Sequence, residues 1–358
     1  MASLSEAAVL DALRAVQDPD LHKDIVALNF VKSVKIDGTT VALVIELTTP
    51  ACPVKDLMRD QARACVLAIG ATQVDIEMTA QVRSVSRHEG NTSPVAGVKN
   101  IIAVGAGKGG VGKTTAAVNL AMALAKFGSK VAIIDGDLYG PNVPIMLGLS
   151  AELHTDDGKI VPAERYGIQV VSMAFLTPDD APVIWRGPML HGAIQQFFRE
   201  VKWTNIDYLI IDMPPGTGDV ALSLSQSVPV AGAVVVSTPQ NVALADTKRA
   251  IAMYRKLNIP VIGILENMSH FICPDCGRES DLFGKGGAET LAIQMNVPFM
   301  GSVPLYEPVR RGGDNGVPIV MAEPESPAAK AFMAAAERVA QQVSIASYQR
   351  KVIPLTAV

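Results

Sequence analysis

A glycine-rich octapeptide constrains the fold of this chain more than any other feature. Residues 107–114 read GKGGVGKT and fit the pattern G-x-x-x-x-G-K-[ST]. An apolar run over Ile101–Ala106 precedes the octapeptide and a helical pattern begins at Thr114, which predicts a strand, a loop and a helix in that order. Such a loop aims backbone N–H groups at phosphate oxygens, and the N-terminus of the following helix adds positive potential. The motif therefore predicts a nucleotide-binding α/β domain.

The predicted nucleotide site is the octapeptide together with the next residue. It comprises Gly107, Lys108, Gly109, Gly110, Val111, Gly112, Lys113, Thr114 and Thr115. Lys113 is expected to neutralise charge on the β- and γ-phosphates of ATP, and the Thr114 hydroxyl is expected to bind Mg²⁺. The flanking strand and helix disfavour the alternative, which is a glycine-rich turn with an accidental lysine.

Two apolar runs of the same region end in an aspartate. KVAIID ends at Asp135 and YLIID ends at Asp212. Because ligands bind at the carboxyl edge of parallel sheets, both carboxylates are expected beside the loop as partners of Mg²⁺. Asp137, two residues further on, is expected to orient the attacking water, since phosphoryl transfer depends on such positioning. The alternative for each strand-ending aspartate is a simple helix cap.

The apolar pattern changes at about residue 100. From there, continuous apolar runs alternate with helical segments such as TTAAVNLAMALAKF, which predicts βαβ units and a parallel sheet covered on both faces. Before it, two β-rich runs meet at Asp37-Gly38, a hairpin signal, and a helix is expected from Pro53. We predict a small α+β domain over 1–84, a polar linker over 85–99, a P-loop NTPase domain over 100–345 and a tail over 346–358.

Composition narrows the range of partners. The 358 residues carry a formal net charge of −4, which gives no electrostatic reason to expect nucleic acid or an anionic membrane as a partner. No uncharged apolar run approaches the roughly 18 residues that span a bilayer, and the acidic first turn is unlike a secretory signal. Four cysteines cannot cross-link a chain of this size, so a reducing, cytoplasmic setting is expected.

The segment FICPDCG carries two cysteines at metal-ligand spacing, Cys273 and Cys276. Two thiolates supply half the ligands of a tetrahedral zinc or of a cubane iron–sulfur cluster. The other ligands can come from Cys52 and Cys65, from His270, or from a second copy of the chain. The last solution places four thiolates on a two-fold axis and suits a bridging 4Fe–4S cluster. A structural zinc knuckle and a thioredoxin-like dithiol are the alternatives.

Lys108 directly follows the first glycine of the octapeptide, and GKGGVGKT resembles the deviant Walker A loop of the dimeric ATPases. That group includes the septum-site and partition ATPases, the arsenical pump ATPase and the nitrogenase iron protein. The resemblance implies a homodimer in which Lys108 acts on the nucleotide of the sister subunit. It also implies that Asp135 and Asp137 form switch I and that 212–219 form switch II.

Together with ENM at 266–268, WRGP at 185–188 and CPDCG, the loop resembles the Mrp/ApbC family of iron–sulfur carrier ATPases over most of 100–345. The resemblance implies an ATP-hydrolysing carrier that binds a labile 4Fe–4S cluster at the homodimer interface and transfers it to apo-proteins. It also assigns to Asn267 a contact with the nucleotide base. FGKGG at 283–287 lacks G-K-[ST] and is expected to be a loop and a helix start.

The N-terminal unit resembles the small iron–sulfur assembly domain through LTTPACP at 47–53. Cys52 precedes the expected helix start at Pro53, where unpaired N–H groups favour a thiolate, so it is a candidate accessory thiol. An ordinary half-buried thiol is the alternative, and Cys65 on the apolar stripe is expected in the core.

Two rival functions use the same nucleotide site. A partition- or positioning-type ATPase would act as a scaffold on surfaces and leaves CPDCG unexplained. An ATP-dependent electron donor would keep its bridging cluster fixed and cycle its redox state instead of transferring it.

Overall fold

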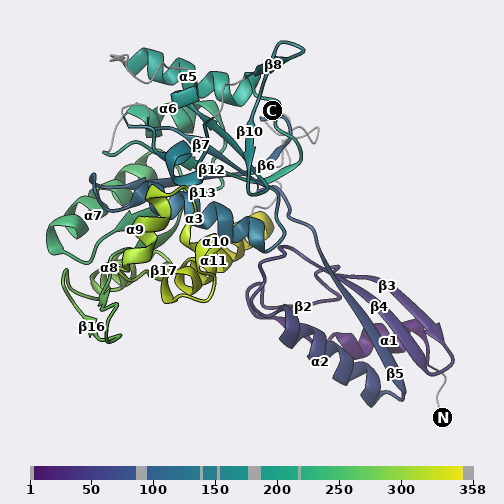
Figure 1. Ribbon diagram of the computed structural model, residues 1–358. Helices are drawn as coiled ribbons and strands as arrows, with labels where there is room; N and C mark the ends of the chain where they lie inside the picture. The colour runs from purple at the N-terminus through teal and green to yellow at the C-terminus, as the bar shows by residue number, and fades with distance from the viewer. Residues whose placement is uncertain are drawn as a thin grey trace. The chain divides into compact units, whose positions relative to one another are not determined.

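The computed structural model describes residues 4–85, 95–137, 140–150, 154–175, 187–216 and 219–349 (Figure 1). Several predicted features lie outside this described part: residues 86–94 of the linker, Trp185 and Arg186 of WRGP, Thr217 and Gly218 of switch II, and residues 350–358 of the tail. The chain forms two compact units, one made of residues 1–83 with 344–358 and the other of 84–343.

The first unit is a three-stranded sheet packed with two helices. β3 (Val31–Asp37) and β4 (Thr40–Leu47) form the expected hairpin, and β5 (Gln73–Ala80) runs parallel to β4. The helices are α1 (Glu6–Leu13) and α2 (Lys55–Ala68), and the short strands β1 (Gln17–Asp18) and β2 (Lys23–Asp24) pair with each other. Alternate residues of β4 are buried, so one face of this sheet carries the core.

The last helix corrects the predicted tail. α11 runs over Pro327–Gln349, so residues 346–349 are helical. The Tyr348 ring meets the Phe30 ring edge-on, with the centroids 6.4 Å apart, and the Arg83 guanidinium lies 5.0 Å from the centre of the same ring. These aromatic and cation–π contacts stabilise the last turn of the helix.

The second unit contains an eight-stranded sheet within the described part of the chain. In spatial order its strands are β10 (Ala163–Arg165), β11 (Ile168–Ser172), β7 (Val131–Asp135), β12 (Ile206–Asp212), β6 (Val98–Ala106), β13 (Gly232–Ser237), β14 (Val261–Glu266) and β17 (Phe299–Ser302). All neighbours are parallel except β10, an antiparallel edge strand. Every residue of β7 and β13 is buried, as expected for strands covered on both faces.

Helices α3 (Lys113–Lys126), α7 (Asn241–Lys256) and α8 (Gly287–Met295) pack on this sheet. The remaining helices are α4 (Val143–Leu147), α5 (Gly187–Glu200), α6 (Asp219–Ser227), α9 (Glu307–Asp314), α10 (Ile319–Ala322) and the 3₁₀ turn η1 (Met173–Phe175). Two small hairpins complete the unit, β8 (His154–Asp156) with β9 (Lys159–Val161) and β15 (Phe271–Ile272) with β16 (Glu279–Ser280). The predicted α/β fold, preceded by a small α+β unit, is confirmed. No helix in the described ranges has the length and apolar character to cross a bilayer.

Candidate functional site

The glycine-rich loop lies between the end of β6 and the start of α3, as the spacing predicts. Gly107 packs so closely on α7 that a side chain there would collide with the backbone of Asp246 and Thr247. Gly112 caps α3 with a left-handed φ of 80°, a conformation that favours glycine. The loop can therefore curl tightly at the N-terminus of a helix, which is the geometry of a phosphate site.

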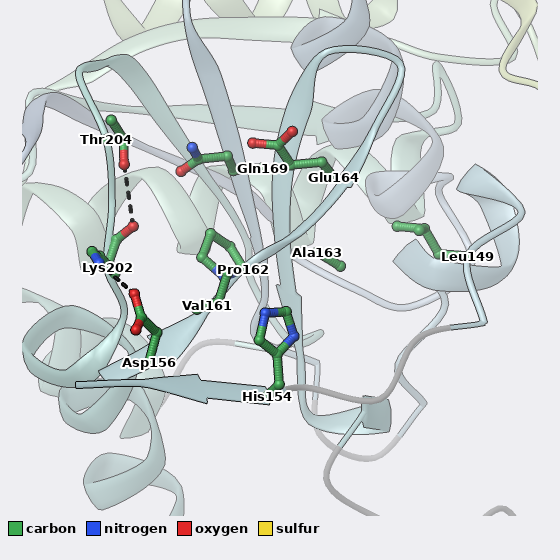
Figure 2. A pocket seen from close by; sticks show the side chains of 10 residues that line it. All are labelled: Leu149, His154, Asp156, Val161, Pro162, Ala163, Glu164, Gln169, Lys202 and Thr204. Carbon is green, nitrogen blue, oxygen red and sulfur yellow. Dashed lines mark hydrogen bonds and ion pairs between the residues drawn. The ribbon is translucent and has the colours of Figure 1, made fainter. Parts of the chain in front are cut away.

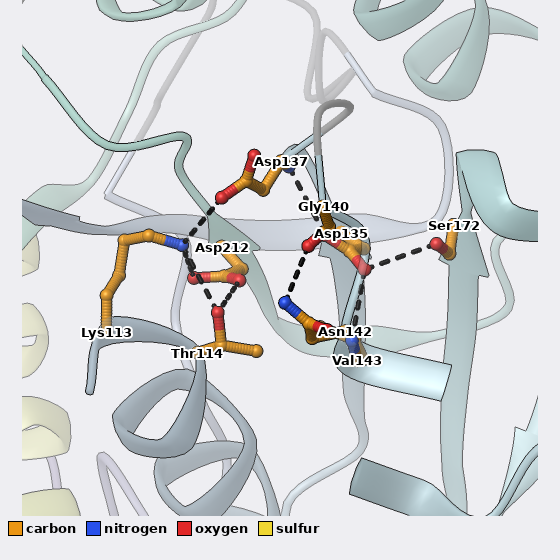
Figure 3. Close-up of polar contacts among 9 residues, drawn as sticks. All are labelled: Lys113, Thr114, Asp135, Asp137, Gly140, Asn142, Val143, Ser172 and Asp212. Atoms are coloured by element: carbon orange, nitrogen blue, oxygen red, sulfur yellow. Dashed lines mark hydrogen bonds and ion pairs between the residues drawn. The ribbon is translucent and has the colours of Figure 1, made fainter. Parts of the chain in front are cut away.

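Strand register brings the predicted carboxylates together. Asp212 of β12 pairs with Asp135 of β7, so both strands end at the same level beside the loop. The Lys113 ammonium donates to Asp212 Oδ1 at 2.6 Å and the Thr114 hydroxyl donates to Asp212 Oδ2 at 2.7 Å (Figure 3). Lys113 Nζ also lies 3.9 Å from Asp137 Oδ2. One buried carboxylate thus holds both predicted phosphate and magnesium ligands of the loop.

Asp135 is fully buried and accepts three hydrogen bonds from residues that the structure describes. Its Oδ1 accepts from the Asp137 N–H at 3.2 Å, and its Oδ2 accepts from the Val143 N–H at 3.1 Å and from the Ser172 hydroxyl at 3.2 Å (Figure 3). Ser172 closes β11 and pairs in register with Asp135. Sequence reasoning missed this serine, although it ends an apolar strand run in the same way as the two aspartates.

The acids outnumber the cations at this edge of the sheet. Burial, and then the neighbouring charge of Asp212, raise the pKa of Asp135 to about 7. Burial also raises the pKa of Asp212, while Lys113 and Thr114 act in the opposite direction. Three carboxylates face one ammonium, and carboxylate and hydroxyl oxygens are ligands that Mg²⁺ prefers. Thr114, Asp135 and Asp212 offer such oxygens, and their binding of a magnesium ion stays a prediction.

The other predicted loop residues are more accessible. Gly109 and Gly110 are exposed at the surface of the loop, and Thr115 is half-buried with its carbonyl accepting from the Asn119 amide at 2.9 Å. Lys108 is half-buried, and none of the described residues forms an ion pair or hydrogen bond with its ammonium. The action of Lys108 on a sister subunit stays a prediction.

Asn267 lies directly beneath the loop. Its side-chain Nδ2 donates to the Val111 carbonyl at 2.9 Å, and the residue is 6% exposed. A side chain on Gly112 would collide with the same amide nitrogen. The structure thus gives Asn267 a contact with the loop itself, and its contact with a nucleotide base stays a prediction.

The cysteine pair occupies the turn of the β15–β16 hairpin. Cys273 N–H donates to the Arg278 carbonyl at 3.0 Å, and Gly277 N–H donates to the Cys273 carbonyl at 2.9 Å. Hydrogen bonds from the backbone of Cys276 and Asp275, and from the Cys276 side chain, lower the pKa of the Cys273 thiol. Cys273 is half-buried and Cys276 is exposed. The turn therefore holds one half-buried thiol with a lowered pKa and one exposed thiol.

The other predicted metal ligands, His270, Cys52 and Cys65, have contacts of their own. In the described ranges, no group of three or more His, Cys, Asp or Glu side chains is arranged to hold a metal. His270 Nδ1 lies 2.9 Å from the Ser269 hydroxyl, and its Nε2 lies 3.7 Å from Glu279. Cys52 and Cys65 belong to the other unit, where both pack against its hydrophobic core.

The environment of Cys52 differs from the expected one. α2 begins at Lys55 and not at Pro53, so Cys52 lies three residues before the helix. The Cys52 carbonyl accepts from the Lys55 N–H at 3.3 Å, which uses these residues for a turn. Cys52 therefore does not directly precede the first turn of α2, and its role as an accessory thiol stays a prediction. Cys65 on α2 is partly buried against the core, as expected.

Glu266 is a second residue that sequence reasoning left without a role. This fully buried acid ends β14 and accepts from the N–H groups of Gly286 at 3.0 Å and Ala288 at 2.8 Å. Ser302 donates to it at 3.2 Å. The N-terminus of α8 is therefore occupied by a side chain of the protein, and the FGKGG segment is a loop and helix start as expected.

A cavity of about 510 Å³ lies elsewhere in the second unit, between the β8–β9 hairpin and the β10–β11 edge (Figure 2). Lys202 pairs with Asp156 across its rim at 2.6 Å. The Gln169 side-chain oxygen in its wall is buried and has no hydrogen-bond partner among the described residues. None of the lining residues belongs to the predicted nucleotide or cluster sites.

Comparison with known proteins gives two family matches. Residues 97–340 match the family described as NUBPL iron-transfer P-loop NTPase, and residues 6–78 match the iron-sulfur cluster assembly protein family. A protein of Synechocystis sp. named iron-sulfur cluster carrier protein is 49% identical over 351 residues, which cover 96% of this chain and 99% of that protein. The protein of the same name from Escherichia coli is 41% identical and covers 98% of this chain and 97% of its own length.

Two solved structures share the fold of the second unit. A nucleotide-binding protein from Archaeoglobus fulgidus in complex with ADP is 38% identical, with a TM-score of 0.56 over 64% of this chain and 90% of that one. The septum site-determining protein MinD from Pyrococcus horikoshii, complexed with Mg-ADP, is 26% identical, with a TM-score of 0.51 over 67% of this chain and 95% of its own.

Proposed function

This chain belongs to the NUBPL iron-transfer P-loop NTPase family, and we propose that it is an ATP-hydrolysing carrier that delivers iron–sulfur clusters to apo-proteins. Relatives of nearly the same length, at 41 to 49% identity, carry the name of iron-sulfur cluster carrier protein. The match of residues 6–78 to an iron–sulfur assembly family fits the same role for the whole chain.

The observation that carries the proposal is the cysteine hairpin in the same unit as the nucleotide loop. A carrier must bind its cargo firmly and still release it, so its thiolates need to be reactive and accessible. Cys273 has a lowered pKa, and both thiols of the pair reach the surface at a tight turn. A buried and fully ligated site would hold a cluster but would not expose it to an acceptor.

The nucleotide half of the function uses the residues around Asp212. Lys113 binds the β- and γ-phosphates after exchanging its ion pair with Asp212, and Asp137 orients the water that attacks the γ-phosphate. Thr114, Asp135 and Asp212 would hold Mg²⁺, and the ion would supply neutralisation of charge on the phosphate oxygens. The Mg-ADP complex of the Pyrococcus horikoshii relative supports this cofactor.

The cluster is a labile 4Fe–4S group shared by two copies of the chain. Four thiolates complete such a cluster, and the hairpin offers two. Since the described residues give the pair no third ligand, a second copy with its own Cys273 and Cys276 supplies a matching half. In that homodimer Lys108, which has no partner among the described residues, acts on the nucleotide of the sister subunit.

The two rivals from the sequence analysis make different predictions. A positioning-type ATPase needs no cysteine pair. The septum site-determining protein from Pyrococcus horikoshii is also only 26% identical to this chain, whereas the Synechocystis protein named as a carrier is 49% identical. An electron donor keeps its cluster through repeated turnovers, whereas a carrier loses it to an acceptor.

The test is anaerobic reconstitution of the full chain with iron and sulfide. The wild type should take up about four iron atoms per two chains, and Cys273→Ala/Cys276→Ala should take up almost none. Cys52→Ala/Cys65→Ala is the matched control and should load like the wild type. Incubation with an apo-protein should then move the iron to the acceptor. A double variant at 273 and 276 that loads normally, or a cluster that never leaves, would contradict the proposal.

A further inference from the structure

Asn267 joins the nucleotide loop to the segment that leads into the cysteine hairpin. Its backbone N–H continues the sheet by donating to the Ser237 carbonyl at 2.8 Å, while its side chain donates to the Val111 carbonyl at 2.9 Å. Val111 is 2% exposed, and among the described residues the Asn267 amide is the donor that its carbonyl accepts from. The residue is therefore fixed at one end by β13 and at the other by the loop.

This hydrogen bond also orients one donor of the phosphate site. A trans peptide points its C=O and N–H groups in opposite directions, and the described residues contain no cis peptide. Because the Val111 carbonyl is held toward Asn267, the Gly112 N–H points away from it. No acceptor in the described part of the chain takes that N–H. Asn267 thus aims a backbone donor of the loop without touching a phosphate.

The segment between Asn267 and Cys273 is short, and backbone hydrogen bonds hold most of it in place. Met268 turns it with a left-handed φ of 55°, which is costly for a residue with a side chain. Beyond this turn, three backbone hydrogen bonds fasten the segment to residues 303–305: Ser269 N–H to Val303 O at 3.0 Å, Leu305 N–H to His270 O at 2.6 Å, and Ile272 N–H to Leu305 O at 3.3 Å. A shift of Asn267 is therefore expected to move Cys273 as well, because the segment between them is short and held by hydrogen bonds.

We infer that Asn267 is a positioning residue that couples occupancy of the phosphate loop to the reactivity of Cys273. A phosphate bound to the Gly112 N–H pulls on the Val111–Gly112 peptide, changes its bond to Asn267 and shifts the start of the hairpin. The inference rests on the proposed function for its purpose, because a carrier needs its nucleotide to act on its cargo. It concerns the metal-free chain as well, and this allows a separate test.

The test measures how fast iodoacetamide alkylates Cys273 in the metal-free full chain, with peptide mass spectrometry to separate the four cysteines. Mg²⁺ with a non-hydrolysable ATP analogue at saturating concentration should change the wild-type rate by about fivefold or more. In Asn267→Leu, which keeps the branched shape of the side chain and removes the donor, the change should fall below twofold at a concentration that again saturates. Asn267→Ala should behave in the same way.

The matched control is Asn119→Ala. Asn119 is another buried amide beside the loop, but it bonds Thr115 and the Val320 N–H of α10, not the path to Cys273. This variant should keep the wild-type response. A wild type without a response, an unchanged response in Asn267→Leu, or an equal loss in Asn119→Ala would each overturn the inference. Should both Asn267 variants fail to fold, hydrogen exchange of residues 269–273 decides, because it must change with nucleotide in the unaltered chain.

Cluster uptake provides an independent readout. Asn267→Leu should load as much iron as the wild type without nucleotide, since it leaves both cysteines in place, but its rate of transfer should no longer depend on nucleotide. Failure of the wild type to load iron would contradict the carrier function and leave the alkylation test intact. A wild type that loads iron normally but shows no alkylation response to nucleotide would overturn the coupling alone.

Discussion

The nucleotide loop and the cysteine hairpin belong to the same unit, but they differ in how many of their functional groups are already buried and hydrogen-bonded in a single chain. At the loop, Lys113 and the strand-end Asp212 are buried, and Asp212 already accepts hydrogen bonds from Lys113 and from the half-buried Thr114. At the hairpin, Cys276 is exposed and the pair has no third ligand within the described ranges. A site for a transition state benefits from preorganisation, whereas a site for a cargo that must leave benefits from open, exchangeable ligands.

The largest expected effect separates the two sites. Lys113→Ala should lower ATP hydrolysis by a factor on the order of 10²–10³, because it removes the preorganised cation of the phosphate site. Phosphate release at saturating ATP measures this. Iron uptake by the reconstituted variant should stay at the wild-type level, and circular dichroism should show an intact fold. Turnover near the wild-type rate would mean that the loop is not the catalytic one.

The next effect tests the buried acids with pH. With its folded pKa raised from 3.8 to about 7, Asp135 must lose a proton before it can bind Mg²⁺. Affinity for Mg²⁺ in the presence of nucleotide should therefore rise by up to about tenfold per pH unit below pH 7 and level off above it. Titration calorimetry between pH 5.5 and 8.5 measures this, and Asp135→Asn should flatten the profile. A wild-type Mg²⁺ affinity that does not change with pH would mean that Asp135 does not have to lose a proton on binding the ion.

The same shift has a consequence for folding. The folded metal-free chain holds the Asp135 proton more tightly than the unfolded chain does, so the group stabilises the fold below about pH 4 and that stabilisation is lost as pH rises toward 7. The raised pKa of Asp212 acts with the same sign. Asp135→Asn should reduce the fall in the free energy of unfolding across this range.

A several-fold effect is expected at the hairpin. Near pH 7, iodoacetamide should alkylate Cys273 several times faster than Cys65, because Cys273 has a lowered pKa and Cys65 packs against the core of the first unit. The ratio should shrink at high pH, because the lowered pKa of the Cys273 thiol then gives it less advantage. Peptide mass spectrometry at pH 6.5, 7.5 and 9 measures it, and a Cys65 that reacts first would contradict the assigned environments.

The smallest effect concerns stability. Cys273→Ser/Cys276→Ser should change the free energy of unfolding of the metal-free chain by less than about 0.5 kcal/mol, because both side chains lie at a surface turn. Urea denaturation measures the change. A larger loss of the free energy of unfolding would show that the thiols stabilise the fold. The hairpin would then not differ from the buried nucleotide site in this respect.

Much of the nucleotide site was predictable because its signals are local. The octapeptide fixes a loop between a strand and a helix, and an acid that ends an apolar run must lie at the edge of the sheet. The same rule applied to Ser172 and Glu266 would have found both, since each ends a strand with buried neighbours. The start of α2 was less predictable, because proline and its neighbours are compatible with a turn as well as with a first helical turn.

The contact of Asn267 with the loop could not be predicted in this way. Its position after β14 follows from the pattern, but its bond to the Val111 carbonyl joins residues 156 positions apart. Local periodicity carries no information on which loop a strand-end side chain will meet. That depends on the spatial order of β6, β13 and β14, which is a property of the whole sheet.

The sequence by itself determined the elements, the phosphate-binding loop, the acids at the strand ends and the spacing of the cysteine pair, because each depends on residues adjacent in the chain. Only the tertiary structure decided that Asp212 holds both Lys113 and Thr114, that Glu266 occupies the N-terminus of α8, and that Asn267 braces the loop. Those contacts arise from strand register and helix packing, where small differences in distance separate a hydrogen bond from no contact at all.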